Sequence, residues 1–98
     1  MNARNKNNHI NTELLFEAIL SLETAEECHI FFEDICTAQE VRTISQRLEV
    51  AKLLSEQKIY SDIVTETGTS TATISRVNRS LHYGSGGYKL VLSRINKK

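Results

Sequence analysis

The sequence predicts an all-α protein that forms one small domain, and three observations support this prediction. The 98 residues include no proline and only four glycines, so few positions interrupt a helix. Strong helix formers occur throughout the chain. Threonines stand at the starts of three apolar segments, as helix-capping residues do. Because 40% of this short chain is apolar, one core is near the limit of what it can build alone.

The first expected helix opens with Thr12 in the segment "TELLFEAILSL". Seven of the nine residues from Leu14 to Leu22 are apolar, which leaves no wide polar face. A helix that is apolar nearly all round needs burial on both sides. This helix therefore requires more covering surface than one neighbouring helix supplies.

The second and third expected helices each begin with a capping box. Thr24 is followed three residues later by Glu27, and Thr37 by Glu40, so hydroxyl and carboxylate can satisfy backbone N–H groups reciprocally. The third helix, in "TAQEVRTISQRLEVAKLLSEQ", carries an apolar stripe with further apolar residues beside it: Val41, Ile44, Leu48 and Ala51, then Val50, Leu53 and Leu54.

The excess of apolar surface on the first and third helices predicts a homodimer. A chain of this size cannot enclose both helices, so we expect them to be exchanged or packed across a two-fold axis. Residues 12–58 would then form a helical dimerisation region. The alternative is a compact monomer with a few exposed leucines, which are ordinary on protein surfaces.

Residues 59–82 predict a helix-turn-helix. Ser61 is expected to cap a short helix that ends at Gly68, where glycine supplies a positive φ at no steric cost. Ser70 or Thr71 can cap the next helix after a short turn. The second helix of such a pair can lie in the major groove of DNA.

The second helix of this pair has one apolar and one polar side. Ile74, Val77 and Leu81 cluster on the wheel and are expected to face the core. Arginine can pair with guanine, hydroxyls can bond bases or phosphates, and an alanine methyl can meet a thymine methyl. Near the helix start, the N-terminal dipole favours phosphate contacts. The residues predicted to bind DNA are Ser70, Thr71, Ala72, Thr73, Ser75, Arg76 and Arg79. The alternative is an amphipathic hairpin with a solvated polar face.

The two ends of the chain have distinct compositions. Residues 83–98 contain the glycine-rich break "YGSGGY", which we interpret as a hinge, and then a last short helix in "YKLVLSRI". This break lacks the lysine and threonine of a phosphate-binding loop. The polar segment 1–11 is expected to be disordered, and residues 12–98 to form one domain.

Charge is distributed unevenly although the formal net charge is zero. Residues 12–60 carry four basic and ten acidic side chains, whereas residues 61–98 carry six basic and two acidic ones. A basic carboxyl-terminal third on an acidic body permits binding to a polyanion such as double-stranded DNA. No run of 18 apolar residues and no signal-peptide pattern is present, so we expect a cytoplasmic protein without a membrane partner.

Catalytic and metal-binding patterns are absent from the sequence. Cys28 and Cys36 lie eight residues apart on one expected helix, too far apart for a disulfide, so we expect reduced, buried thiols. Their spacing with His29 matches no compact metal-ligand pattern. The acidic pairs on the same helix are expected to form a solvated face. We therefore expect neither an enzyme nor a metal protein.

The segment "SQRLEVAKLL" and the later "YSDIVTETGTSTATISRVNRSLHYG" resemble the Trp repressor family, and more closely its YerC/YecD group. With "LFEAILSLETAEECHIFFEDICTAQEV" ahead of them, the resemblance covers residues 12–92, and "STATISR" is its most specific part. It implies a bacterial transcriptional regulator, an intertwined homodimer with about six helices per chain and a helix-turn-helix.

The resemblance does not carry the tryptophan effector with it. The family's indole pocket uses an arginine and then a glycine in the recognition helix, and a second arginine on the long helix before it. Arg76 matches the first arginine, but Val77 stands at the glycine and Gln46 opposite the second arginine, one residue before Arg47. Valine fills space that a flat ring needs, and glutamine lacks a fixed positive charge for a carboxylate. We predict that L-tryptophan does not bind, and no cofactor is expected.

Two functional hypotheses follow. The first is a sequence-specific DNA-binding regulator, expected to be a repressor, acting as a homodimer on a palindromic site with half-sites about 34–36 Å apart. The second is a helical adaptor that uses its acidic body or the helix-turn-helix face to bind another protein. The basic stripe between residues 70 and 79 favours the first.

Overall fold

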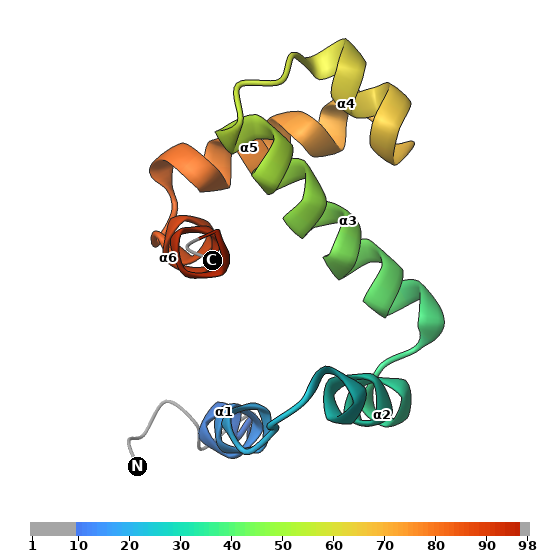
Figure 1. Ribbon diagram of the computed structural model, residues 1–98, viewed down its shortest axis with the longest axis vertical. Coiled ribbons are helices and arrows are strands. Elements are labelled where there is room, and N and C mark those ends of the chain that lie inside the picture. Colours follow the sequence, from blue (N-terminus) through green and yellow to red (C-terminus); the bar gives the residue numbers. More distant parts are fainter. Residues whose placement is uncertain (1–9, 97–98) are drawn as a thin grey trace. The chain divides into compact units, whose positions relative to one another are not determined.

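The computed structural model describes residues 10–96, which form six α-helices and no strand. This arrangement confirms the all-α fold class and is shown in Figure 1. The helices are α1 (Thr12–Leu20), α2 (Ala25–Ile35), α3 (Ala38–Ser55), α4 (Tyr60–Thr67), α5 (Thr71–Tyr83) and α6 (Gly87–Ile95).

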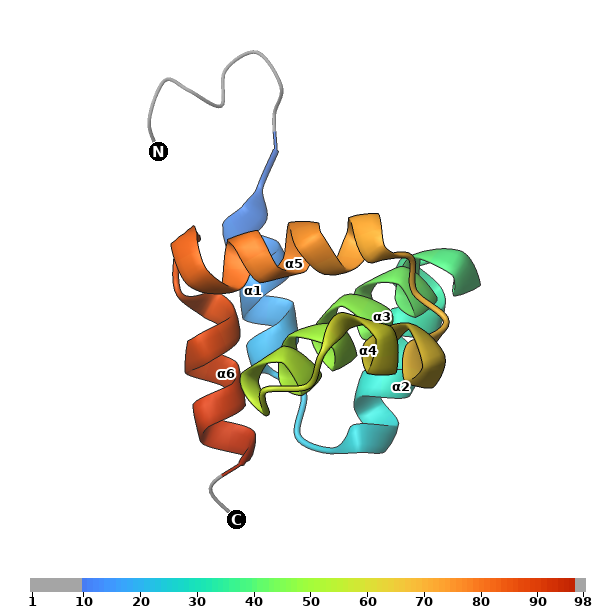
Figure 2. The ribbon, with the colours of Figure 1, turned by 90° about the horizontal axis from the view of Figure 1, so that it is seen from above.

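The helices divide into two compact units. The first unit, up to Thr37, contains α1 and α2, and the second, from Ala38 on, contains α3 to α6. In the second unit, α4, α5 and α6 gather around the carboxyl-terminal part of α3, and α6 lies crosswise to α5 in both views (Figures 1 and 2).

The first unit has no buried residue in either helix. Leu14 and Phe16 of α1 are 61% and 55% exposed, and Leu20 is 83% exposed. The helices therefore have well-formed ends but no core of their own. This agrees with the expectation that α1 needs further surface to cover it.

The caps of the first unit follow the sequence in part. Helix α1 begins at Thr12 as expected, but its cap is Asn11, whose Oδ1 accepts the N–H of Leu14 at 3.0 Å. At α2 the expected cap is confirmed, because Thr24 Oγ1 accepts the N–H of Glu27 at 3.0 Å. The carboxylate of Glu27 accepts the N–H of Glu23 at 2.8 Å, one residue before the cap.

The core of the second unit contains apolar residues from all four helices. The buried members are Val50, Ala51 and Leu53 of α3, Ile63 of α4, Ile74 and Val77 of α5, and Leu92 of α6. Leu81 of α5 is also buried. The three α5 residues on this side are those that the helical wheel placed toward the core, so that prediction is confirmed.

Helix α3 ends earlier than the sequence suggested, at Ser55, because the chain turns through a left-handed residue. Gln57 has a φ of 70° and donates its N–H to the carbonyl of Leu54 at 3.0 Å. The N–H of Lys58 reaches the carbonyl of Leu53 at 3.1 Å. These two bonds are those of a Schellman motif, in which glycine is the usual left-handed residue.

Some sequence predictions fall outside the described part of the chain. Residues 1–9 of the tail expected to be disordered, and residues 97–98 of the last segment, lie outside it. Within residues 10–96, no helix has the length and apolarity that crossing a membrane requires.

Candidate nucleic-acid interface on the helix-turn-helix

The turn between α4 and α5 is built around Gly68. Its φ of 72° places it in the left-handed region, and its N–H donates to the carbonyl of Val64 at 2.9 Å. The expected positive φ is therefore confirmed. The expected cap at the other end of α4 is wrong: Ile59 precedes the helix without a side-chain bond, and Ser61 lies within it. The Ser61 carbonyl instead accepts the hydroxyl of Thr65 at 3.0 Å.

Two threonines flanking Gly68 fix the turn. The hydroxyl of Thr67 lies 2.7 Å from the carbonyl of Ile63 and 2.8 Å from the hydroxyl of Thr69, and it accepts the Thr69 N–H at 3.1 Å. Thr69 is the buried polar residue of this unit among the described residues. Thr67 is half-buried and Thr69 is buried, so these bonds favour one turn geometry, because breaking them would leave polar groups with little access to water.

Helix α3 is also bonded to this turn. Gln46 is half-buried, and its Nε2 donates to the carbonyl of Thr67 at 3.4 Å. The bond is long, so it contributes mainly by orienting the Gln46 amide. The sequence could not indicate this contact, since the two residues are 21 positions apart.

Helix α5 begins with a side-chain cap. Ser70 Oγ accepts the N–H of Thr73 at 3.2 Å and lies 3.2 Å from the Thr73 hydroxyl. Of the two alternatives that the sequence left open, Ser70 is the cap and Thr71 is the first helical residue. No acidic residue lies in the first turn of α5, so the positive end of the helix dipole is not neutralised locally.

The residues predicted to bind DNA lie mostly on the exposed side of α5. Thr73 is half-buried, and the other six are exposed: Ser70, Thr71, Ala72, Ser75, Arg76 and Arg79. Ile74 and Val77 face the core between them. A helix held by its apolar side in this way presents its polar side at the surface of the unit.

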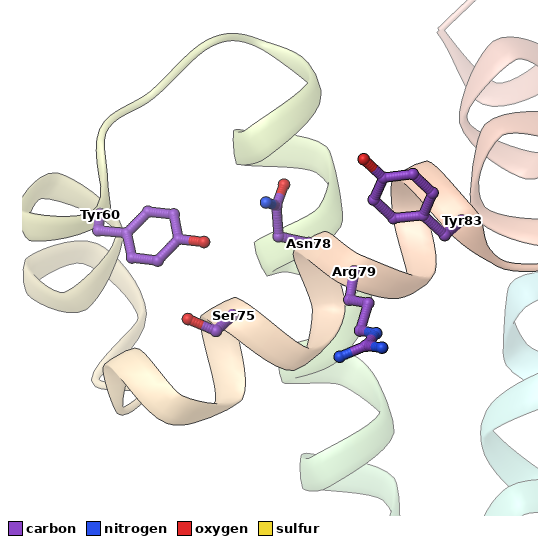
Figure 3. A pocket seen from close by; sticks show the side chains of 5 residues that line it. All are labelled: Tyr60, Ser75, Asn78, Arg79 and Tyr83. Carbon is purple, nitrogen blue, oxygen red and sulfur yellow. The ribbon is translucent and has the colours of Figure 1, made fainter.

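A surface hollow of about 510 Å³ brings two of these residues together with three residues outside the predicted DNA-binding set. Ser75 and Arg79 line it with Tyr60 of α4, and with Asn78 and Tyr83 of α5 (Figure 3). The Tyr60 ring points from α4 toward α5. Arg76 and the other four predicted residues do not line the hollow. No sequence pattern marked Tyr60, because only the packing of α4 against α5 brings it there.

The surface around α5 carries positive charge without carboxylates nearby in sequence. No Asp or Glu follows Glu66, whereas Arg76, Arg79, Lys89 and Arg94 lie in the described part of that segment. Neither Arg76 nor Arg79 forms an ion pair or a hydrogen bond with residues 10–96. Unpaired guanidinium groups on an exposed helix face are free to bind anions.

Val77 and Gln46, which stand where the family's tryptophan pocket has a glycine and an arginine, both make contacts within the fold. Val77 is 3% exposed and belongs to the core, so its isopropyl group occupies space on the buried side of α5. Gln46 is bonded to Thr67 as described. Each side chain therefore has a role in positioning α5 or its preceding turn.

The remaining candidates for chemistry differ partly from expectation. Cys28 and Cys36 are free thiols, as expected, but the expectation that they are buried is wrong for this chain: Cys28 is exposed and Cys36 half-buried. They sit on α2 and at its end, in the unit that has no core. Among the described residues, no three His, Cys, Asp or Glu side chains are grouped closely enough to hold a metal ion.

Comparisons with known proteins relate the chain to one family. A family model described as Trp repressor protein matches residues 11–96. The chain is 53% identical to the uncharacterized protein YerC of Bacillus subtilis strain 168 over 83 residues, which cover 85% of this chain and 80% of YerC. The crystal structure of a TrpR-like protein from Eubacterium eligens matches at 56% identity with a TM-score of 0.84, covering 87% of this chain and 88% of that one. The crystal structure of a protein from Staphylococcus aureus that is described as a Trp repressor matches at 49% identity with a TM-score of 0.84. The match covers 89% of this chain and 87% of that one.

Proposed function

Because the chain belongs to the Trp repressor family, we propose that it is a sequence-specific DNA-binding transcriptional regulator that acts as a homodimer without tryptophan. The observation that carries this proposal is the recognition helix α5. Its apolar side is anchored in the core, and its exposed side combines hydroxyls, a methyl group and two unpaired arginines. Family membership confirms the resemblance to Trp repressors, which adds to the DNA-binding hypothesis made from the residues of the helix-turn-helix.

The geometry of the turn supports insertion of α5 into a DNA groove. Gly68 and the bonded pair Thr67 and Thr69 fix the angle between α4 and α5. Ser70 caps α5 so that its first turn is well formed. A rigid helix start is what base contacts need, because an ordered side chain loses less entropy on binding.

The uncovered first unit supports the homodimer. Helices α1 and α2 have no buried residue, although much of their surface is apolar. The large apolar side chains exposed there are Leu14, Leu15, Phe16, Ile19, Leu20, Ile30 and Ile35. A second copy of the chain would cover such surface by a two-fold interface, which also matches the palindromic sites that dimeric regulators bind.

The core of the second unit supports independence from tryptophan. Val77 fills the core side of α5 and Gln46 is bonded to the turn, so both positions already position the recognition helix. Binding of an effector can shift a helix only if the effector favours one of two arrangements. A helix already packed by its own side chains offers an indole ring no empty place at Val77.

Selection from random duplex DNA, with the size of the free protein measured in parallel, tests the proposal. We expect enrichment of a palindrome bound by a dimer, with an affinity that added tryptophan leaves unchanged. The alternative result is a stable protein that enriches no sequence and whose weak DNA binding disappears as the salt concentration rises. That result would show that the protein binds DNA only by nonspecific attraction to phosphates. The adaptor hypothesis would then take precedence.

One residue gives a sharper test on the enriched site. Arg79→Ala should cost about 1–3 kcal/mol of specific binding if this side chain contacts a base. Arg94→Ala on α6 is the matched control, because it removes the same charge from another helix of the basic segment. Equal binding by Arg79→Ala and the wild type would show that Arg79 is not a specificity contact.

A further inference from the structure

The hollow beside α5 is lined by hydrogen-bond donors and contains no carboxylate. Its polar groups are the hydroxyls of Tyr60, Ser75 and Tyr83, the amide of Asn78 and the guanidinium of Arg79. Hydroxyl, amide and guanidinium side chains are the groups that donate to phosphate oxygens in protein–DNA complexes. The chemistry of the lining therefore suits an anion that accepts several hydrogen bonds.

These donors are unoccupied within the chain. None of the five side-chain polar groups is hydrogen-bonded to another group among residues 10–96. Tyr60 is half-buried and packs against the core, so its ring is held in place and its hydroxyl is presented. Tyr83 is 86% exposed, and its ring lies 6.4 Å from that of His82. The hollow is thus lined on the α4 side by the packed Tyr60 ring and at the end of α5 by the exposed Tyr83 ring.

The shape and position of the hollow favour a duplex over a small anion. It is a surface hollow and not an enclosed cavity, so a small ligand bound there would remain partly in water. Ser75 and Arg79 belong both to the hollow and to the set predicted to bind DNA. A helix that enters a groove has the sugar-phosphate backbone along its flanks, and this flank is the one that faces α4.

We propose that the hollow receives backbone phosphates of the DNA duplex, and that Tyr60, Asn78 and Tyr83 donate hydrogen bonds to them. This inference rests on the proposed DNA-binding function and extends it to three residues outside the predicted set. Contacts of this kind set the position of α5 on the duplex and carry no sequence information directly. They apply equally to preferred and unrelated sequences.

The test compares three tyrosine variants of the full chain on the selected duplex and on a scrambled duplex. Tyr60→Phe and Tyr83→Phe each remove one hydroxyl and keep the ring. Tyr88→Phe on α6 is the control, because Tyr88 also packs against the core but does not line the hollow. We expect each of the first two variants to bind both duplexes about 3- to 10-fold more weakly, the loss typical of one hydrogen bond. Tyr88→Phe should bind as the wild type does.

The preferred sequence and the salt dependence complete the test. Both hollow variants should select the same sequence as the wild type and keep its salt slope, because tyrosine carries no charge and releases no counterion. Wild-type affinity of both variants on both duplexes would overturn the inference and leave the proposed function intact. A changed sequence preference would also overturn it, since the tyrosines would then contact bases. The wild type could also select no sequence while both hollow variants still bind duplex DNA more weakly than it does. That result would support the phosphate contacts of the hollow and refute sequence-specific regulation.

Discussion

Replacing Gly68 by alanine should destabilise the protein through backbone strain alone. Gly68 adopts a φ of 72°, and a Cβ atom added there would meet no other atom within 4 Å. No steric overlap therefore adds to the cost. A left-handed conformation costs an L-residue about 1–2 kcal/mol, and the smaller freedom of alanine in the unfolded chain offsets roughly 0.5–1 kcal/mol of that cost. We therefore expect Gly68→Ala to lower the free energy of unfolding by about 1 kcal/mol.

The chain provides a matched substitution of opposite sign. Gln57 ends α3 at a φ of 70°, within two degrees of Gly68. Gln57→Gly relieves the same strain, but the added freedom of glycine in the unfolded chain offsets roughly 0.5–1 kcal/mol of the gain. We expect a net stabilisation of up to about 1 kcal/mol.

Urea and thermal unfolding at one fixed protein concentration measure both effects, since the stability of an oligomer depends on concentration. For a chain of this size, about 1 kcal/mol corresponds to roughly 4–8 °C in Tm. Gly68→Asn should lose less than Gly68→Ala, because asparagine tolerates the left-handed region better. If Gly68→Ala matched the wild type and Gln57→Gly lost stability, the left-handed assignments of both turns would be refuted.

Two further predictions concern single side chains. Ser70→Ala removes the α5 cap and should lower the free energy of unfolding, measured in urea, by about 1 kcal/mol. Ser80→Ala, on the exposed side of the same helix, is the control and should be neutral or slightly stabilising. An equal loss from both variants would show that the cap contributes nothing. The hydrogen bond from Lys52 lowers the pKa of the Glu56 carboxyl, so this exposed pair stabilises the fold above the ordinary pKa of Glu and loses that contribution as acid protonates Glu56. Glu56→Gln should therefore be less stable than the wild type at neutral pH by a small margin that vanishes in acid, and a margin that is constant with pH would contradict this.

The helix-turn-helix could be predicted in detail because its signals are local. Gly68 marks the turn since few other residues accept its backbone conformation, and Ile74, Val77 and Leu81 mark the core side of α5 by their spacing. The candidate DNA-binding residues follow from the opposite side of the same helix. Their contacts with DNA remain a prediction.

The errors in helix ends have a common cause. Several residues near each helix start can cap it, and the backbone entry angle decides which one does. Asn11 rather than Thr12 caps α1, and α4 begins without the expected Ser61 cap. The left-handed Gln57 was not predictable, because glutamine carries no turn signal.

The sequence by itself determined the order of the helices, the position of the turn and the buried side of α5, because each depends on residues that are close together in the chain. Only the tertiary structure decided which distant residues meet. It bonded Gln46 to Thr67 across 21 positions, and it placed Tyr60 of α4 opposite Asn78 and Tyr83 in one hollow. Such contacts depend on how helices pack, and helix packing follows from the fit of whole faces rather than from any local pattern.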